Sequence, residues 1–345
     1  LPAGLIERRI SRLVEDEYPR TLAERQGQTL ELLGAIPPGT DLLELTRSTL
    51  ASQVIGLYVP ETEDLLVTRS GEPGALEAIT LAHELQHALA DDALGLPISR
   101  RADPMTADAD LAALALIEGD ATLTMELYAL RYVELGEQLS LAGAAGAGED
   151  LDGLPDFIQR QILFPYTAGF EYVCERYAEG GWAAVDDAYT DDPPNSTAEL
   201  MMISRTDLDP GRPLPSGTLP PPWDATLRSQ IGAAELSWLF AAPGGDPARA
   251  LPDPEGAAVQ WGGGETQLWE DGDRTALSMS ISDAGLGELC GAVKAWYLAA
   301  FPDETLISEE GLTVLRSPER SGAIVCEPGS IRVGIGPDAE TAVAL

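Results

Sequence analysis

Positive charge is scarce in this sequence. Lys294 is the only lysine, and 21 basic residues stand against 57 acidic ones, which gives a formal net charge of −36. Such a negative field disfavours binding to nucleic acids and to anionic membrane surfaces, and it repels acidic substrates. The sequence therefore predicts no nucleic-acid partner.

Cysteine is also rare. The chain has Cys174, Cys290 and Cys326, and none of them shows Cys-x-x-Cys spacing. This excludes a cysteine zinc site and a thioredoxin-like motif. Cys290 and Cys326 both fall in the C-terminal part, where they can pair in an oxidising compartment. Three unpaired core cysteines fit the spacings equally well, so both alternatives stay open.

Long apolar runs are absent. No stretch has the length needed to span a bilayer, so the sequence predicts no transmembrane segment. The chain begins at Leu1 rather than at Met. We therefore expect that a signal peptide, an anchor or another upstream segment has been removed, and that the protein is extracellular or held at the cell surface. The sequence does not define the oligomeric state.

Histidine is the most informative of the rare residues. The chain has two histidines, and both lie in the motif His83-Glu84-Leu85-Gln86-His87. Residues four apart share one face of a helix, so the two imidazoles can bind one Zn²⁺ ion. Glu84 lies one residue along, where it can act on a water molecule without being a ligand. The alternative is a pair of buried histidines that bind no metal.

A catalytic zinc site of this kind needs a third protein ligand, and a carboxylate is expected because the chain has no third histidine. Glu118 is the best candidate. It lies on the apolar face of the next expected helix, where an unpaired carboxylate is costly. Gly119 beside it permits a close approach of two helix backbones. The competing carboxylates on the same helix are Asp110, Asp120 and Glu126.

Three further residues are candidates for supporting roles. Tyr166 can donate a hydrogen bond to a developing oxyanion, although a buried tyrosine with a purely structural bond is the alternative. Asp120 and Thr122 are the candidate partners for the N–H groups of the two histidines.

Apolar periodicity predicts an α+β chain in two parts. Residues 1–205 are expected to form a mostly helical domain with a small β-hairpin, and residues 206–222 a Pro-rich linker. Expected helices cover 5–33 with a break at Pro19, 40–52, 75–90, about 111–130, 154–163, 168–179, 181–189 and 196–203. The segment Phe164–Gly169 is expected to separate two of these helices because it contains Pro165. The hairpin strands are expected near 53–59 and 65–68.

Residues 223–345 are expected to form a small α+β domain with an antiparallel sheet and no assigned role. The expected helices lie near 224–241 and 284–299, with a short one at the end. The expected strands lie near 265–270, 275–281, 312–316, 322–327 and 331–335.

Three stretches together resemble a known family. They are Gln53-Val54-x-Gly56-x-Tyr58-x-Pro60-Glu61-Thr62, His83-Glu84-Leu85-x-His87-Ala88-Leu89 and Leu116-Ile117-Glu118-Gly119-Asp120-Ala121-Thr122. They look like uncharacterised prokaryotic zinc metallopeptidase-like proteins of the gluzincin type. The resemblance covers about residues 40–205, with a fainter similarity at Trp261-Gly262-Gly263. It implies that residues 1–205 form a zincin-like metallopeptidase domain, mostly helical around a small sheet, and that the protein hydrolyses peptides with zinc.

These observations favour a zinc-dependent metallopeptidase that acts on a protein or peptide substrate. In the resembling family, the Ser-Thr segment commonly continues into a glutamine and a histidine. Here Ala198-Glu199-Leu200-Met201-Met202 follows it. The missing histidine favours the alternative of a catalytically weak or inactive pseudopeptidase that serves as a binding or scaffold protein. A third interpretation is a zinc hydrolase acting on a non-peptide amide, such as a cell-wall linkage.

Overall fold

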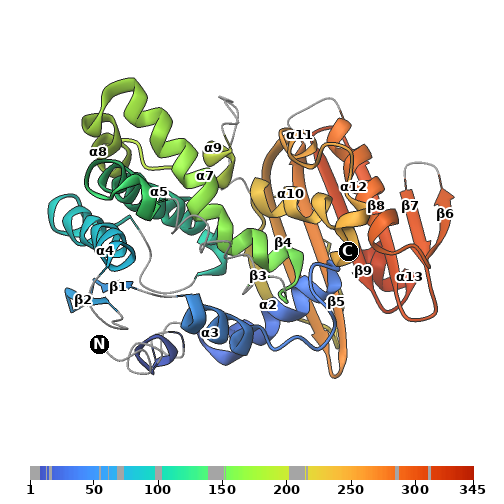
Figure 1. Cartoon of the computed structure of the whole chain (residues 1–345). Helices are drawn as coiled ribbons and strands as arrows, with labels where there is room; N and C mark the ends of the chain where they lie inside the picture. Colours follow the sequence, from blue (N-terminus) through green and yellow to red (C-terminus); the bar gives the residue numbers. More distant parts are fainter. Residues whose placement is uncertain are drawn as a thin grey trace.

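The chain is α+β, with a helical N-terminal part and an antiparallel sheet in its C-terminal part (Figure 1). The expected class is therefore confirmed. The computed structural model describes residues 8–12, 14, 18–53, 56–60, 62–67, 74–97, 103–138, 151, 153–201, 214, 217–283, 287–309 and 312–345. Most of the expected linker over 206–222 lies outside these residues. Among the described helices, none is both long and apolar enough to cross a membrane.

The N-terminal part is built from helices and one hairpin. Its helices are α2 (Arg20–Leu32), α3 (Leu42–Gln53), α4 (Ala75–Ala93), α5 (Ala107–Tyr132), α7 (Asp156–Gly180), α8 (Trp182–Thr190) and α9 (Thr197–Leu200), with a 3-10 turn η1 (Pro104–Thr106) before α5. The hairpin pairs β1 (Gly56–Val59) with β2 (Asp64–Val67) in antiparallel register, as expected. Glu77 begins α4 by accepting a hydrogen bond from the Gly74 N–H at 2.9 Å, the pattern of a capping box.

Helix α7 corrects one prediction, because it continues through Pro165 instead of breaking there. A proline inside a helix removes one backbone hydrogen bond and costs about 3 kcal/mol or more. Burial outweighs that cost, since α7 places Phe157, Phe164 and Val173 in the core, and each such side chain contributes about 1.5–3 kcal/mol. The local sequence around Pro165 does not reveal this tertiary packing.

The C-terminal part contains a seven-stranded antiparallel sheet in the order β3-β4-β5-β9-β8-β7-β6. The strands are β3 (Asp224–Gln230), β4 (Trp261–Asp271), β5 (Arg274–Asp283), β6 (Thr305–Glu309), β7 (Leu312–Arg316), β8 (Ser321–Glu327) and β9 (Ser330–Gly336). The expectation of a helix from 224 is wrong for β3, and β6 was not predicted. Both are edge strands whose pairing partners fix their conformation, and β3 pairs with residues about forty positions away.

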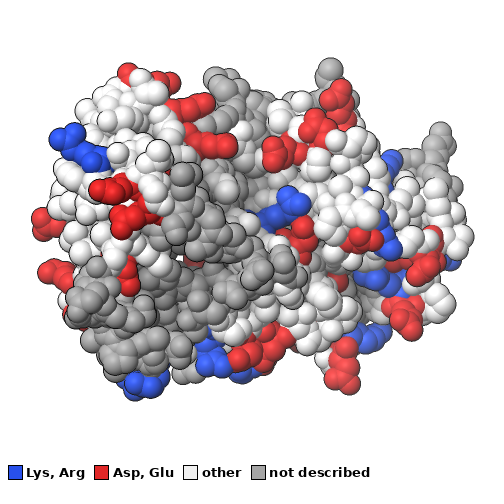
Figure 2. All heavy atoms as spheres, viewed as in Figure 1, with Lys and Arg blue, Asp and Glu red and all other residues white. Residues whose placement is uncertain are grey.

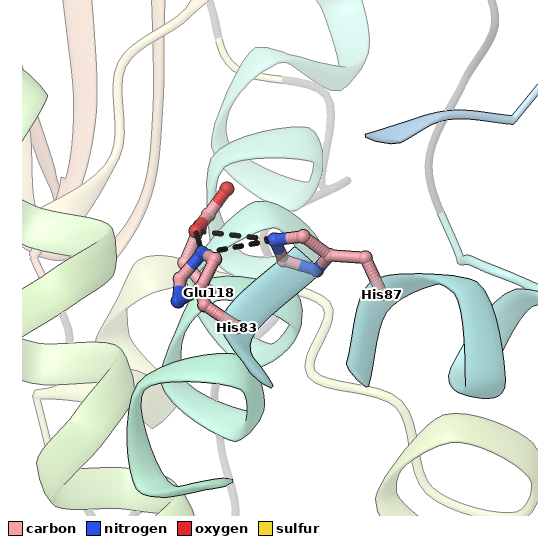
Figure 3. A group of neighbouring side chains, drawn as sticks. All are labelled: His83, His87 and Glu118. Atoms are coloured by element: carbon pink, nitrogen blue, oxygen red, sulfur yellow. Dashed lines mark hydrogen bonds and ion pairs between the residues drawn. The ribbon is translucent and has the colours of Figure 1, made fainter. Parts of the chain in front are cut away.

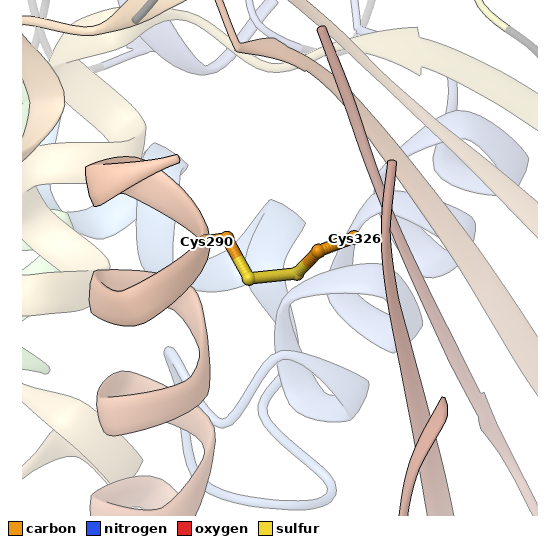
Figure 4. Close-up of a disulfide and its surroundings, with 2 residues drawn as sticks. All are labelled: Cys290 and Cys326. Carbon is orange, nitrogen blue, oxygen red and sulfur yellow. A yellow bond between two sulfur atoms is a disulfide. The ribbon is translucent and has the colours of Figure 1, made fainter. Parts of the chain in front are cut away.

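Short helices complete this part. They are α10 (Ala233–Ala241), α11 (Pro254–Ala258), α12 (Glu288–Ala300) and α13 (Ala339–Ala344), with 3-10 turns η2 (Pro243–Gly245) and η3 (Pro247–Arg249). A disulfide between Cys290 and Cys326 ties α12 to β8 (Figure 4), which decides between the two alternatives for these cysteines. Cys174 is a free, partly buried thiol.

One apolar core extends across both parts of the chain. Phe157 and Phe164 of α7 pack edge-on against Trp238 of α10, with ring centroids 5.4 and 5.6 Å apart. Edge-to-face aromatic pairs add about 0.5–1.5 kcal/mol beyond their area burial. On the face shown in Figure 2, acidic side chains lie over both parts, with fewer basic ones among them.

Candidate metal centre

The two histidines of α4 meet Glu118 of α5 at the centre of the helical part (Figure 3). The His83 Nε2 atom lies 3.1 Å from His87 Nε2 and 3.1 Å from Glu118 Oε2. The His87 Nε2 atom lies 3.6 Å from the same carboxylate oxygen. Each residue thus contributes one ligand atom to a compact triangle, as the sequence predicts for these three residues.

The size of this triangle fits a zinc ion. With zinc–ligand bonds of about 2.0–2.2 Å, neighbouring ligand atoms of a tetrahedral site lie about 3.3–3.5 Å apart. The observed separations of 3.1, 3.1 and 3.6 Å bracket that value. Three protein ligands of the two-His-one-Glu type leave the fourth tetrahedral position open, which is the donor set of catalytic rather than structural zinc sites.

Electrostatics links the three side chains. A histidine that is protonated at Nε2 can donate a hydrogen bond to the Glu118 carboxylate. Burial by itself raises the pKa of Glu118, but hydrogen bonds from His83 and His87 outweigh it and lower the pKa to about 2. Burial lowers the pKa of His87, but the Glu118 carboxylate outweighs it and raises the pKa. The site therefore favours a positive charge near Glu118, which a protonated histidine or a bound cation would supply.

Glu84 lies beside this triangle and is not part of it. Its side chain is buried, with 6% of the residue exposed. Burial raises the pKa of Glu84, and the neighbouring histidines oppose the rise. A raised carboxyl pKa suits a group that must take up a proton and release it near neutral pH.

The hairpin strand β1 holds Glu84 in place, a contact the sequence reasoning missed. The Tyr58 N–H donates a hydrogen bond to the Glu84 carboxylate, so this backbone amide of β1 points away from β2 and toward α4. A side chain at Gly56 would place its Cβ 2.6 Å from the Glu84 Cγ atom. The Tyr58 hydroxyl also donates to Asp91 of α4 at 2.8 Å, which ties β1 to α4 beside the site.

Neither candidate supporting residue forms a hydrogen bond to a histidine among the described contacts, but the Asp120 carboxylate lies close enough to His87 for the two to interact electrostatically. Asp120 is 1% exposed, and one of its oxygens accepts hydrogen bonds from Gln86 at 2.8 Å and Tyr189 at 3.0 Å. Its other oxygen is buried and has no partner among the described residues. Burial raises the pKa of Asp120 while these hydrogen bonds and His87 lower it. The hydroxyl of Thr122 is also buried without a described partner, so nothing links it to a histidine.

Two glycines set how closely α5 and α7 approach. A Cβ at Gly119 would meet the backbone of Gly169, and a Cβ at Gly169 would meet the carbonyl oxygen of Ala115. The helices therefore cross with backbone against backbone. This close crossing brings Tyr166 of α7 next to Glu118 of α5. The sequence predicts that Gly119 lets the helix of the histidines and the helix of Glu118 approach closely, but the close backbone contact at Gly119 is between α5 and α7.

Tyr166 lies at the rim of the site. Its ring stacks near that of His83, with centroids 6.4 Å apart and an interplanar angle of 28°. Its hydroxyl donates a hydrogen bond to Glu118, and burial together with that carboxylate raises the pKa of Tyr166. The hydroxyl thus keeps its proton near neutral pH and remains a donor.

The competing carboxylates on α5 lie elsewhere. Asp110 accepts a hydrogen bond from Thr106 at 2.7 Å at the beginning of α5, and Glu126 is exposed. The described part of the chain contains one group of three or more potential ligand residues, namely His83, His87 and Glu118. Met202, where the resembling family places a histidine, lies outside the described residues.

No protein-family model matches this chain, and neither the curated proteins nor the solved structures contain a significant match.

Proposed function

We propose that this chain is a zinc-dependent peptidase of the gluzincin type, with His83, His87 and Glu118 as the metal ligands and Glu84 as the general base. The observation that carries this proposal is the convergence of three ligand atoms within 3.1–3.6 Å of one another. It is supported by a buried glutamate that lies next to them without taking part. Zincin-like architecture of the helical part belongs to the same proposal.

Each residue has a separate task in this mechanism. A zinc ion held there would act as a Lewis acid on a carbonyl group and lower the pKa of a water molecule. Glu84 accepts a proton from the attacking water and delivers it to the leaving amine. Tyr166, which keeps its hydroxyl proton, donates to the oxygen on which negative charge develops.

The unpaired edge of β1 is the proposed binding surface for substrate. An extended peptide can add to an exposed strand through backbone hydrogen bonds. The Tyr58 N–H on this edge donates to Glu84, so a peptide that pairs with neighbouring backbone groups of β1 would lie beside the general base. The net charge of −36 disfavours acidic peptides. We therefore propose neutral or basic protein segments as substrates, met outside the cell, where the disulfide persists.

The test combines metal content with peptide cleavage. The wild-type protein, Glu84→Gln and Glu77→Gln are compared for zinc bound per chain and for cleavage of a quenched peptide library. We expect equal zinc content in all three and a loss of about a hundredfold to ten-thousandfold in cleavage for Glu84→Gln alone. Glu77→Gln is the matched control, because Glu77 lies on the same helix and caps its beginning. His83→Ala should lose zinc.

The second candidate function is a zinc-bearing binding protein. The observation that favours it is the absence of a third histidine anywhere in the sequence, which leaves Tyr166 as the proposed oxyanion donor. Zinc binding without Glu84-dependent cleavage would refute the peptidase and support this candidate. Absence of zinc would refute both.

A further inference from the structure

A cavity of about 360 Å³ lies where the helical part meets the sheet, and it does not include the histidines. Its walls come from α2, α3, the first turns of α5 and α7, and the edge strand β3. Leu111 and Ile162 line it, whereas Glu118 and Tyr166 lie about two turns and one turn further along the same two helices. The cavity and the metal centre are thus separate sites that share two helices.

Most of the cavity wall is apolar. Leucine and isoleucine side chains from four helices face it, together with the ring of Phe157. Hydroxyl groups in the wall already have partners: Thr46 donates to the Leu42 carbonyl at 2.8 Å, Ser229 donates to the Pro104 carbonyl at 3.1 Å, and Tyr18 donates to the Gln26 side chain. A volume of this size with such a lining falls in the range of small-molecule sites.

Hydrogen-bond acceptors gather at one end, where β3 leads into α10. Gln230 lines the cavity, and its Oε1 atom is buried without a partner among the described residues. Glu235 also lines the cavity and accepts one bond, from the Gly232 N–H at 3.0 Å. A carboxylate can accept about four hydrogen bonds, so most of its capacity is open toward the cavity.

The charge of the lining selects among possible ligands. None of the lining residues within the described part of the chain is Lys, Arg or His. A buried anionic head group would therefore lack a counter-charge, which is costly. A cationic head group would instead pair with Glu235, and the net charge of −36 raises the local concentration of cations.

We propose that this cavity binds an apolar amine, whose hydrocarbon body lies among α2, α3 and α7 and whose ammonium group donates to Glu235 and Gln230. Burial raises the pKa of Glu235 to about 7, and a bound ammonium group favours the charged form of this carboxyl. The proposal is independent of zinc and of peptide cleavage.

The experiment measures binding of octylamine, octanol and octanoate by isothermal titration calorimetry on the full chain. We expect octylamine to bind more tightly than octanol and octanoate to bind weakest. Glu235→Gln should weaken octylamine binding by about tenfold to a hundredfold and leave octanol binding unchanged. The glutamine still accepts the Gly232 N–H in a capping box, so the helix begins as before.

Matched controls separate this effect from a general loss of charge. Glu77→Gln removes a charge at the same position of another capping box and should keep wild-type affinity for octylamine. His83→Ala should keep it as well. Thr46→Trp and Leu30→Trp, introduced separately, should fill the cavity and abolish binding of all three compounds.

Two results would overturn the proposal. One is equal affinity for octylamine and octanoate. The other is octylamine binding that is unchanged in Glu235→Gln or in a folded Thr46→Trp or Leu30→Trp protein, which would place the compound elsewhere on the surface.

Discussion

Two buried glutamates, one in each part of the molecule, have different partners. Glu304 in the sheet part has a side chain only 3% exposed and pairs with Arg320 at 3.3 Å. Glu118 in the helical part has a side chain 15% exposed, and its ion pairs within the described chain are with His83 and His87. Arginine is always charged, so the first pair is complete within the protein. Histidine is charged only when protonated, so the second arrangement has room for the zinc ion that we propose.

The buried polar side chains of the two parts also differ in charge. In the sheet part they are mostly serine and threonine hydroxyls. In the helical part they include Glu84, Asp108 and Asp120, whose charged forms lose more free energy on burial. We infer a division of roles between the two parts. The sheet part mainly stabilises the fold, whereas the helical part keeps buried carboxylates that lower the free energy of unfolding, and Glu84 and Asp120 among them lie at the proposed metal centre.

The largest test of this division is removal of the disulfide. The bond closes a loop with a sequence separation of 36 residues, and chain-entropy reasoning assigns such a loop about 3–4 kcal/mol. Cys290→Ala/Cys326→Ala should lower the free energy of unfolding in urea by that amount. Zinc content should stay at the wild-type level, and a loss of zinc would contradict the division.

A pH titration tests the border between the two parts. Burial raises the pKa of Asp108 to about 6 and that of Glu235 to about 7. Both values lie above those of the unfolded chain, so the stability from the protonated forms is complete below about pH 4 and is lost as the pH rises through the folded values. The free energy of unfolding should therefore fall between about pH 4 and pH 7, by up to about 3 kcal/mol for Glu235.

Glu235 and Glu77 each accept a backbone hydrogen bond at the beginning of a helix, so replacing each of them by glutamine provides the control for this titration. Glu235→Gln should flatten the fall near pH 7, whereas Glu77→Gln should keep the wild-type slope, because hydrogen bonding to the backbone lowers the pKa of Glu77. Identical slopes in all three proteins would show that Glu235 is solvated.

Two glycines on helices test packing in each part. Gly169→Ala introduces a Cβ against the carbonyl oxygen of Ala115, whereas a Cβ at Gly291 of α12 meets nothing within 4 Å. We expect Gly169→Ala to lower the free energy of unfolding by about 1–3 kcal/mol. Gly291→Ala should raise it by about 0.5–1 kcal/mol, through helix propensity. Urea unfolding measures both, and equal effects would mean that the α5–α7 crossing is not tight.

The smallest expected effect concerns Asp120 and Thr122, which follow Glu118 on α5 and are not themselves proposed ligands. Asp120→Asn should lower zinc affinity by about tenfold to a hundredfold, the usual range for groups next to metal ligands, because it removes a buried negative charge that acts on His87. Thr122→Val should leave it unchanged, because the Thr122 hydroxyl has no partner among the described residues. Competition with a chromogenic chelator measures both affinities, and the opposite ranking would reverse our assignment.

The site was predictable from sequence to the extent that its residues are constrained locally. His83 and His87 share a helix, and Glu118 stood out because a carboxylate on an apolar helix face needs a partner. The contacts of Gly56 and Tyr58 with Glu84 were missed, since they join segments about 26–28 residues apart that no periodicity connects. Strand β3 and the unbroken α7 escaped prediction for a related reason, because their tertiary partners override local preference.

The contact between Gly119 and Gly169 also offers a way to find relatives of this chain. A His-Glu-x-x-His motif is short and occurs by chance in many sequences. A chain that assembles the same centre must also bring its second and third site helices together backbone to backbone. The combined pattern is then His-Glu-x-x-His, followed by Glu-Gly as in Glu118-Gly119, followed by Tyr-x-x-Gly as in Tyr166 to Gly169. Searching for the three in this order selects sequences by the geometry they can build, even where overall similarity has been lost.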